Sequence, residues 1–187
     1  MSAQTYVQHF HSCCQLYYYF SQQLLNITFL LLCIHSVTLT SYIPSGLPLP
    51  EHFTIVDSPL PTAADLKEGG ILLQILAMSA DPYLRSGCKS EANGGAVPRP
   101  MTGFVSGKVL ASKRRDYIAG DLFGASLPFC TVQHITAEAA QKTLMWKLTG
   151  MVTEENISFG VGVLGMPGST AYGGFLDVLR PEKDQTT

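Results

Sequence analysis

The first fifty residues of this chain of 187 residues contain no Asp, Glu, Lys or Arg. All 12 basic and 14 acidic side chains therefore fall in residues 51–187, so two different compositions meet near Pro50. The formal net charge is -2 and the pI is near 6.2. A domain that binds nucleic acid through a basic face carries the opposite balance. The charge therefore argues against nucleic acid as a partner.

Cysteine is also scarce. The chain has 5 cysteines, which is too few for a disulfide scaffold, and no two of them form a Cys-x-x-Cys pair. An odd number of scattered cysteines suits reduced thiols in a cytosolic protein better than a disulfide network. We therefore expect a cytoplasmic protein, with a membrane-associated protein as the alternative.

A long uninterrupted apolar run is missing as well. The most apolar stretch lies at residues 24–43, but polar side chains from Asn26 to Ser41 interrupt it, and a membrane-spanning helix needs about 20 predominantly apolar residues. Residues 1–43 hold no Lys or Arg that could orient an inserted helix or begin a signal peptide. We interpret residues 1–43 as an uncharged apolar extension, either disordered or, in the alternative reading, a weak membrane segment at residues 24–43.

The charged remainder is rich in short strand patterns. Gly and Pro turns separate these patterns, and Gly107 inside one of them predicts a bend or bulge. The strands are expected at residues 53–57, 71–78, 104–110, 122–124 and 130–135. Residues 86–100 contain several Gly and Pro and are predicted to be loop. Many short strands with such turns indicate a compact β-barrel or sandwich.

Helical patterns follow the strands. Residues 137–148 consist largely of good helix formers. A second helix is predicted from Ser169 to Leu179, with Ser169 or Thr170 as its N-cap. Between them, the glycines at 160, 162 and 165 have the spacing of a dinucleotide fingerprint, but no strand precedes them and too few residues follow for a βαβ unit. The fold class is therefore mainly β with C-terminal helices (α+β), and this glycine stretch is not read as a phosphate loop.

Two local clusters have both a functional and an ordinary interpretation. Residues 113–115 read Lys-Arg-Arg and could contact a phosphate, although three charges in a turn are more often only solvated. His9, His11, Cys13 and Cys14 could hold a metal ion, but their spacing is not that of a structural zinc site. We favour the ordinary interpretation for both clusters and assign no metal ligand.

Three stretches together resemble a known family. Residues 47–61 resemble its opening strand, residues 77–85 (AMSADPYLR) its SxDPYMR segment, and residues 162–172 (GVLGMPGSTAY) its GVLGMPGLTAY segment. The family is that of the zinc-independent medium-chain dehydrogenase/reductases of the NADP-dependent alkenal double-bond reductase type, which include the prostaglandin reductases. The resemblance covers residues 44–181.

The resemblance implies a GroES-like β-barrel lobe over residues 44–150. Residues 151–187 would then be a helical linker that enters a Rossmann domain, and the strand and glycine-rich turn that open such a domain in the family do not follow Pro181. The resemblance thus identifies an N-terminal lobe without its Rossmann domain, and it predicts an exposed apolar surface on the helix from Ser169 to Leu179.

The resemblance also implies roles for five residues. Tyr83 would line the substrate pocket, and the cofactor-binding residues would be Asp81, Pro82, Met166 and Thr170, beside the nicotinamide end of NADP(H). Ordinary interpretations remain for each: Asp81-Pro82 as a turn former, Tyr83 and Met166 as core residues, and Thr170 as a helix cap. No catalytic residue is assigned.

Members of the family reduce the carbon–carbon double bond of α,β-unsaturated aldehydes and ketones with NADPH. Zinc is not expected, because residues 101–103 read Met-Thr-Gly where zinc-dependent relatives have Gly-His-Glu. The implied partners are a small enal or enone substrate and NADP(H), while the oligomeric state stays open. The alternative is a non-enzymatic β-barrel remnant or a partner-binding module, held at a membrane if residues 24–43 insert.

A simple assay separates these alternatives. We expect the purified chain, incubated with NADPH and a medium-chain enal, to show no loss of the absorbance of the reduced cofactor. A dinucleotide needs the helix N-terminus and crevice of a Rossmann domain, and the sequence pattern predicts neither. Measurable turnover would eliminate the non-enzymatic alternative and contradict this expectation.

Overall fold

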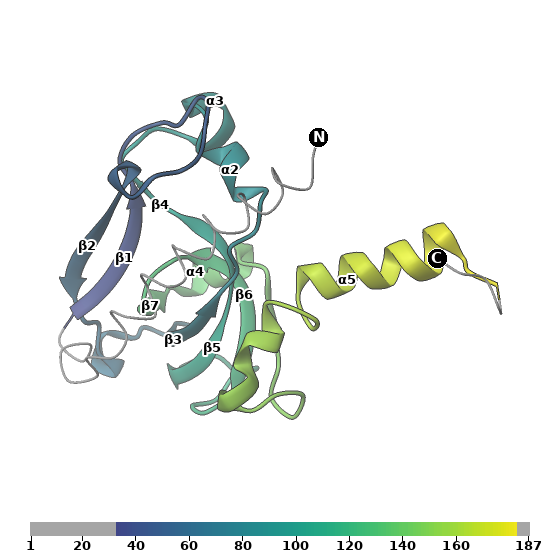
Figure 1. The fold of residues 1–187 in the computed structure, drawn as a ribbon. Helices are drawn as coiled ribbons and strands as arrows, with labels where there is room; N and C mark the ends of the chain where they lie inside the picture. The colour runs from purple at the N-terminus through teal and green to yellow at the C-terminus, as the bar shows by residue number, and fades with distance from the viewer. Residues whose placement is uncertain (1–32, 183–187) are drawn as a thin grey trace. The chain divides into compact units, whose positions relative to one another are not determined.

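The computed structural model describes residues 33–182 and divides into two compact units. Among these residues the first unit comprises 33–65, Ala80–Gly103 and Pro128–Gln133, and the second comprises Leu66–Ser79, Phe104–Leu127 and 134–182. Each unit carries a sheet, and the longer helical segments come last in the chain (Figure 1). The predicted fold class, mainly β with C-terminal helices, is confirmed. The described residues contain no Rossmann domain.

The first unit carries a three-stranded sheet in the order β2-β1-β4. Strand β1 runs antiparallel to β2, from the pair Cys33↔Pro59 to the pair Leu39↔Phe53. The small core of this unit gathers Leu39, Ile43, Cys88 and Met101. The elements of this unit are β1 (Cys33–Leu39), η1 (Pro50–His52), β2 (Phe53–Pro59), η2 (Ala63–Asp65), α2 (Leu84–Gly87), α3 (Glu91–Gly94) and β4 (Arg99–Pro100).

Strand β1 lies inside the segment that we interpreted as an extension. Val37 and Leu39 contribute to the core, and the polar Ser36 and Thr38 alternate with them. This period of two is that of a half-buried strand, but the missing charges made the segment look foreign to the domain. The loop expected at residues 86–100 also contains α3 and β4, so that expectation was partly wrong.

The membrane interpretation of residues 24–43 falls partly outside the described residues, and its described part contains the strand β1. Within residues 33–182, no helix is both long enough and apolar enough to cross a membrane. Residues 24–32 of the candidate segment are not described, and neither are His9, His11, Cys13 and Cys14. The metal reading of those four side chains is therefore untested.

The second unit carries a five-stranded sheet in the order β7-β3-β5-β6-β8. Most of β3 is buried, as predicted from its apolar run, with Ile71 and Leu73 fully enclosed. The elements of this sheet and of the segments that follow are β3 (Ile71–Met78), β5 (Thr102–Ser112), β6 (Leu122–Pro128), β7 (Val132–Ile135), α4 (Ala137–Lys142), β8 (Met145–Lys147), η3 (Glu154–Gly160), α5 (Met166–Gly173) and η4 (Gly174–Leu179).

Gly107 determines how closely β5 approaches β3. A Cβ atom at this position would lie 1.9 Å from the carbonyl oxygen of Gln74, which is far inside van der Waals contact. The pairing of the two strands shifts register between Ile75 and Ala77, next to the residues opposite Gly107. The irregularity predicted from a glycine inside the strand is therefore confirmed, and its cause is a backbone contact that no other residue permits.

The helix expected at residues 137–148 is wrong beyond Lys142. Helix α4 ends there, and β8 pairs with β6 instead. The ring of Trp146 in β8 lies on Gly124, where a Cβ atom would come within 2.3 Å of it. Packing of the indole against the backbone of β6 thus outweighs the helix propensity of this segment.

A buried carboxylate secures the same end of the sheet. Asp121 accepts hydrogen bonds from the backbone N–H of Ile118 at 2.9 Å and the hydroxyl of Thr149 at 3.0 Å. It also pairs with the ammonium of Lys147 at 2.8 Å. These donors, with Lys147 the largest contribution, lower the pKa of Asp121 below its ordinary value. The carboxylate therefore stays ionised and joins the start of β6 to the end of β8.

The last helix begins earlier than predicted. Helix α5 starts at Met166, with Gly165 as its N-cap and Pro167 in its first turn, as is common at helix starts. The expectation of Ser169 or Thr170 as the cap was therefore wrong. As expected, large apolar side chains of this segment are exposed: Tyr172, Phe175, Leu176, Val178 and Leu179.

The contact at Gly107 predicts a specific loss of stability. Gly107→Ala should destabilise the second unit by about 1–3 kcal/mol or more, because the new methyl group overlaps a backbone carbonyl that cannot move independently. Gly174→Ala is the matched control. A Cβ atom at Gly174 would have open space around it to 4 Å, the φ of -60° is helical, and removing a helical glycine stabilises by roughly 0.5–1 kcal/mol. Urea unfolding of both variants measures the difference, and equal effects of the two substitutions would contradict this role of Gly107.

Candidate functional site

The segment Asp81-Pro82-Tyr83 forms the start of a single helical turn in the first unit. The N–H of Leu84 donates to the carbonyl of Asp81 at 3.1 Å, and the N–H of Arg85 donates to that of Pro82 at 3.2 Å. Proline suits this place because its fixed φ fits a turn and its missing N–H is not needed there. The turn-forming role of Asp81-Pro82 is thus present. The contact of Asp81 and Pro82 with a cofactor is still a prediction.

Tyr83 is not a core residue, because 47% of it is exposed. Partial burial and, second, the carboxylate of Asp81 raise the pKa of the phenol above its ordinary value. Both effects disfavour the phenolate. The hydroxyl therefore stays protonated at neutral pH and can donate a hydrogen bond. The core interpretation of Tyr83 was wrong, because nearly half of the residue is exposed.

Asp81 itself has a polar atom without a partner. Its Oδ2 is buried and accepts no hydrogen bond from the described residues. A buried acceptor without a donor is costly and is found mainly where a ligand or water supplies the missing donor.

Arg85 joins this turn to a neighbouring loop. Its Nη2 and Nε donate to the carbonyl of Gly46 at 3.1 and 3.4 Å. The loop is further held by the N–H of Ile43, which donates to the carbonyl of Cys88 at 2.8 Å. Arg85 ends the motif at residues 77–85, but no role was predicted for it. Its position two residues after Tyr83 in the same turn was the signal that could have identified it as a positioning residue.

Met166 and Thr170 lie one turn apart on α5, in the second unit. The hydroxyl of Thr170 donates to the sulfur of Met166 at 3.5 Å. Thr170 is exposed and Met166 is half-buried, so the two side chains form one accessible edge of the helix. The cap reading of Thr170 fails, because the helix begins a full turn earlier.

The glycines before α5 serve backbone packing. A Cβ atom at Gly168 would lie 1.8 Å from the carbonyl oxygen of Val163, and one at Gly165 would lie 2.7 Å from that of Gly160. The stretch follows η3, a 3-10 helix, and not a strand. It therefore lacks the strand–turn–helix context of a dinucleotide fingerprint.

The predicted site residues thus form two local groups. Asp81, Pro82 and Tyr83 share one turn of the first unit, and Met166 and Thr170 share one helix edge of the second. The roles assigned to all five residues stay predictions.

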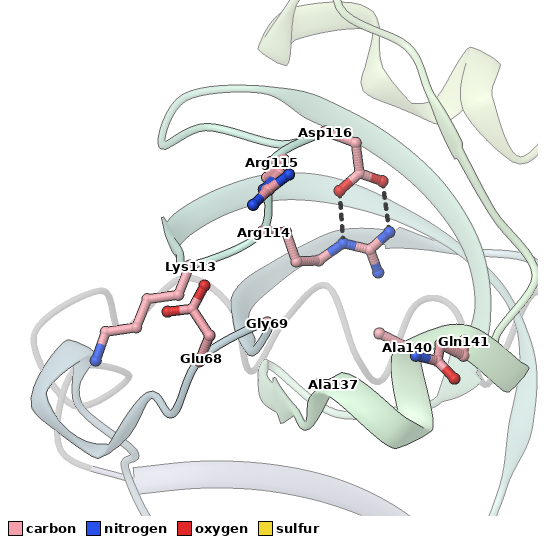
Figure 2. Close-up of a pocket in the computed structure, with 9 residues that line it drawn as sticks. All are labelled: Glu68, Gly69, Lys113, Arg114, Arg115, Asp116, Ala137, Ala140 and Gln141. Carbon is pink, nitrogen blue, oxygen red and sulfur yellow. Dashed lines mark hydrogen bonds and ion pairs between the residues drawn. The ribbon is translucent and has the colours of Figure 1, made fainter.

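A hollow of about 400 Å³ lies beside the basic tripeptide in the second unit (Figure 2). Two of its three cations are engaged: Arg114 forms a two-pronged ion pair with Asp116, with Nε at 2.8 Å from Oδ1, and Lys113 donates to the carbonyl of Leu66. Glu68 adds a second carboxylate to the lining. With two of the three cations paired internally, the hollow gives no support to a phosphate contact at residues 113–115.

Comparison with known proteins connects this geometry to a family. Residues 35–145 match the family model described as the N-terminal domain of oxidoreductase. The chain belongs to this oxidoreductase family. It is also 32% identical over 146 residues to the NADPH-dependent curcumin reductase of Escherichia coli strain K12, covering 76% of this chain and 39% of that protein. The resemblance to medium-chain reductases found in the sequence is therefore confirmed.

Further relatives also match this chain over an N-terminal oxidoreductase lobe. Prostaglandin reductase 1 of Sus scrofa is 32% identical over 141 residues, covering 75% of this chain and 40% of that protein. The crystal structure of CurA from Vibrio vulnificus matches with a TM-score of 0.63 at 28% identity, covering 80% of this chain and 42% of that one. The same protein in complex with NADPH matches with a TM-score of 0.62 at 27% identity, covering 79% and 42%. The lobe thus spans about two fifths of the length of these relatives.

Two details refine the sequence interpretation of the lobe. The family match begins at residue 35, within β1, so residues 35–43 belong with the family although they carry no charge. Among residues 33–182, no three or more His, Cys, Asp or Glu side chains are placed to hold a metal ion. The absence of zinc stays a prediction.

The interaction between Asp81 and Tyr83 can be tested without any ligand. Asp81→Asn should lower the pKa of the Tyr83 phenol, because it removes a negative charge that disfavours the phenolate. The pKa should still lie above the ordinary value, since burial is the larger cause. An alkaline absorbance titration, taken as the difference from the same chain carrying Tyr83→Phe, measures it. Asp57→Asn is the matched control and should leave the Tyr83 pKa unchanged; an equal response of the two variants would contradict the proximity of Asp81.

Proposed function

We propose that this chain forms the substrate-side lobe of an NADP(H)-dependent oxidoreductase that reduces the carbon–carbon double bond of α,β-unsaturated aldehydes or ketones. The observation that carries the proposal is the partly exposed side chain of Tyr83, whose phenol is protonated, in a turn that Arg85 ties to the loop at Gly46. Relatives that are named as NADPH-dependent curcumin reductase, prostaglandin reductase and NADP-dependent 2-alkenal reductase support this substrate class.

The chemistry assigned to Tyr83 follows from where charge develops. When hydride adds to the β-carbon of an enal or enone, negative charge accumulates on the carbonyl oxygen, and the α-carbon then takes up a proton. A hydrogen-bond donor fixed at that oxygen stabilises the charge as it forms. The raised pKa of Tyr83 makes it a donor and not a source of a free proton, so its role is to bind and polarise the carbonyl.

The family resemblance is what supports a cofactor role for four residues. NADPH would supply the hydride when bound. Asp81 and Pro82 lie in the first unit, and Met166 and Thr170 lie one turn apart on α5 in the second, where the hydroxyl of Thr170 donates to the sulfur of Met166. The residues do not fit the phosphates of NADPH, since Arg114 and Lys113 are engaged within the fold. These roles of Asp81, Pro82, Met166 and Thr170 are proposals.

The location and the domain bounds belong to the same proposal. Cys88 and Cys130 are both buried and free, and burial raises the pKa of Cys130 to about 11. Thiols of this kind are unreactive and suit a reducing compartment, which supports the cytoplasm. Residues 44–150 were expected to form the barrel lobe; because the family match begins at residue 35, within β1, the proposed lobe starts there and ends at residue 150, with residues 151–187 as the proposed linker.

Binding of an enone tests the role of Tyr83 directly. We expect saturation-transfer NMR to detect a medium-chain enone on the full chain, and Tyr83→Phe to weaken its binding roughly 2- to 10-fold, which corresponds to the loss of one neutral hydrogen bond of about 0.5–1.5 kcal/mol. Tyr172→Phe, on an exposed tyrosine of α5, is the matched control and should change nothing. If both variants bind like the original chain, Tyr83 does not contact the substrate carbonyl.

A further inference from the structure

Strand β2 is an exposed edge of the three-stranded sheet in the first unit. It is the first strand in the order β2-β1-β4, so among the described residues β1 is its one neighbour (Figure 1). Every residue from Thr54 to Pro59 is exposed, including the apolar Ile55 and Val56, at 41% and 42%. Successive side chains of a strand point to opposite faces. Both faces of this edge are therefore accessible.

The hydrogen bonds of β1 reveal which backbone groups of β2 are free. The N–H of Val37 donates to the carbonyl of Phe129, and its own carbonyl accepts from the N–H of Met101. The carbonyl of His35 likewise accepts from the N–H of Thr131. The backbone groups of His35 and Val37 therefore point away from β2.

Pairs in an antiparallel ladder alternate between hydrogen-bonded and non-hydrogen-bonded. Since Val37 lies opposite Ile55, and His35 opposite Asp57, these two pairs are the non-hydrogen-bonded ones. The N–H and C=O groups of Ile55 and Asp57 must then point outward, along the free edge. Neither residue takes part in the backbone hydrogen bonds that the described residues form outside the strand ladders.

The usual protections of an edge strand are weak in β2. Natural edges are commonly shortened, bulged, or supplied with lysine and proline. Strand β2 has 7 residues in unbroken register with β1 and contains no lysine, and its proline stands at the very end. Its one charge, on Asp57, is held by the imidazole of His35, with Oδ1 at 2.6 Å from Nδ1. This edge is therefore open to another strand.

We propose that β2 pairs with β2 of a second copy of this chain, antiparallel and centred on Val56. In this register Ile55 of one copy and Asp57 of the other face each other and exchange their free N–H···O=C bonds, on both sides of the centre. Val56 meets Val56 in the close, non-hydrogen-bonded pair, and Thr54 meets Ser58. β-Branched and hydroxyl pairs of this kind stabilise antiparallel strands.

Two features of β2 favour the register centred on Val56 over the registers centred on Ile55 and Asp57. Centring on Ile55 would require the N–H of Phe53, which already donates to the carbonyl of Pro50. Centring on Asp57 would place two carboxylates directly opposite each other, which is unfavourable. With Val56 at the centre, each Asp57 keeps its own His35 and faces an isoleucine. The proposal concerns assembly only and does not depend on the proposed reductase function.

Sedimentation velocity over a range of concentrations tests the pairing. We expect the full chain to approach the mass of two copies as its concentration rises. Val56→Lys should hold it at the mass of one, because it places two ammonium groups in the closest pair. Val178→Lys is the matched control, since Val178 is 79% exposed on η4, and it should leave the dimer intact. A chain that stays monomeric, or a dimer abolished by Val178→Lys and not by Val56→Lys, would overturn the proposal.

Disulfide trapping tests the register and does not depend on how well the lysine variant folds. In a background with Cys13, Cys14 and Cys33 replaced by serine, Val56→Cys should form a covalent dimer on mild oxidation. The Cα atoms of a non-hydrogen-bonded pair lie about 4.5 Å apart, within the roughly 4.4–6.8 Å of disulfides. Thr54→Cys, which would face Ser58, should not cross-link to itself. The pairing is refuted if Val56→Cys fails to cross-link, which is the result expected if residues 1–32 of the same chain cover the edge. It is also refuted if Thr54→Cys cross-links equally well.

Discussion

The pairing of β3 with β5 is the constraint on which most of the second unit depends, and it rests on one backbone contact. The carbonyl of Gln74 occupies the space where any residue other than glycine at position 107 would place its Cβ atom. The two strands pair from Ile71↔Ser112 onward, and a bond from the N–H of Ser79 to the carbonyl of Phe104 at 2.8 Å continues the contact beyond β3. The ladder thus ends two residues before Asp81, where the turn of the candidate site begins.

The opposite end of that sheet is held by a different kind of contact. Asp121 is buried, ionised and surrounded by three donors, and the indole of Trp146 fills the space above Gly124. A charge that is fully hydrogen-bonded in the native state makes the surrounding geometry specific, because any other arrangement would leave it unsatisfied. These contacts explain why a segment with the composition of a helix becomes strand β8.

The sheet of the first unit carries little charge. Its central strand β1 contains no Asp, Glu, Lys or Arg, and its edge strand β2 has only Asp57. Charged side chains are a usual means of keeping edge strands apart, and β2 has few of them. The lack of charge also explains why β1 was not predicted from the sequence. The residues of β1 belong to the apolar stretch at residues 24–43, which has no charged residue to mark where the strand begins.

The sequence by itself determined the fold class, the buried strand β3, the irregularity at Gly107 and the family. These features follow from local patterns: a period of two in the strands, glycine where a backbone must come close, and two motifs whose spacing is specific. Only the tertiary structure decided that residues 143–148 leave the helix, that Tyr83 is partly exposed, and that Arg85 holds the loop at Gly46. Each of these depends on a contact between residues far apart in the chain or on the burial of a single atom. Local propensity contains no information about such contacts, because their free energy exists only once the chain has folded.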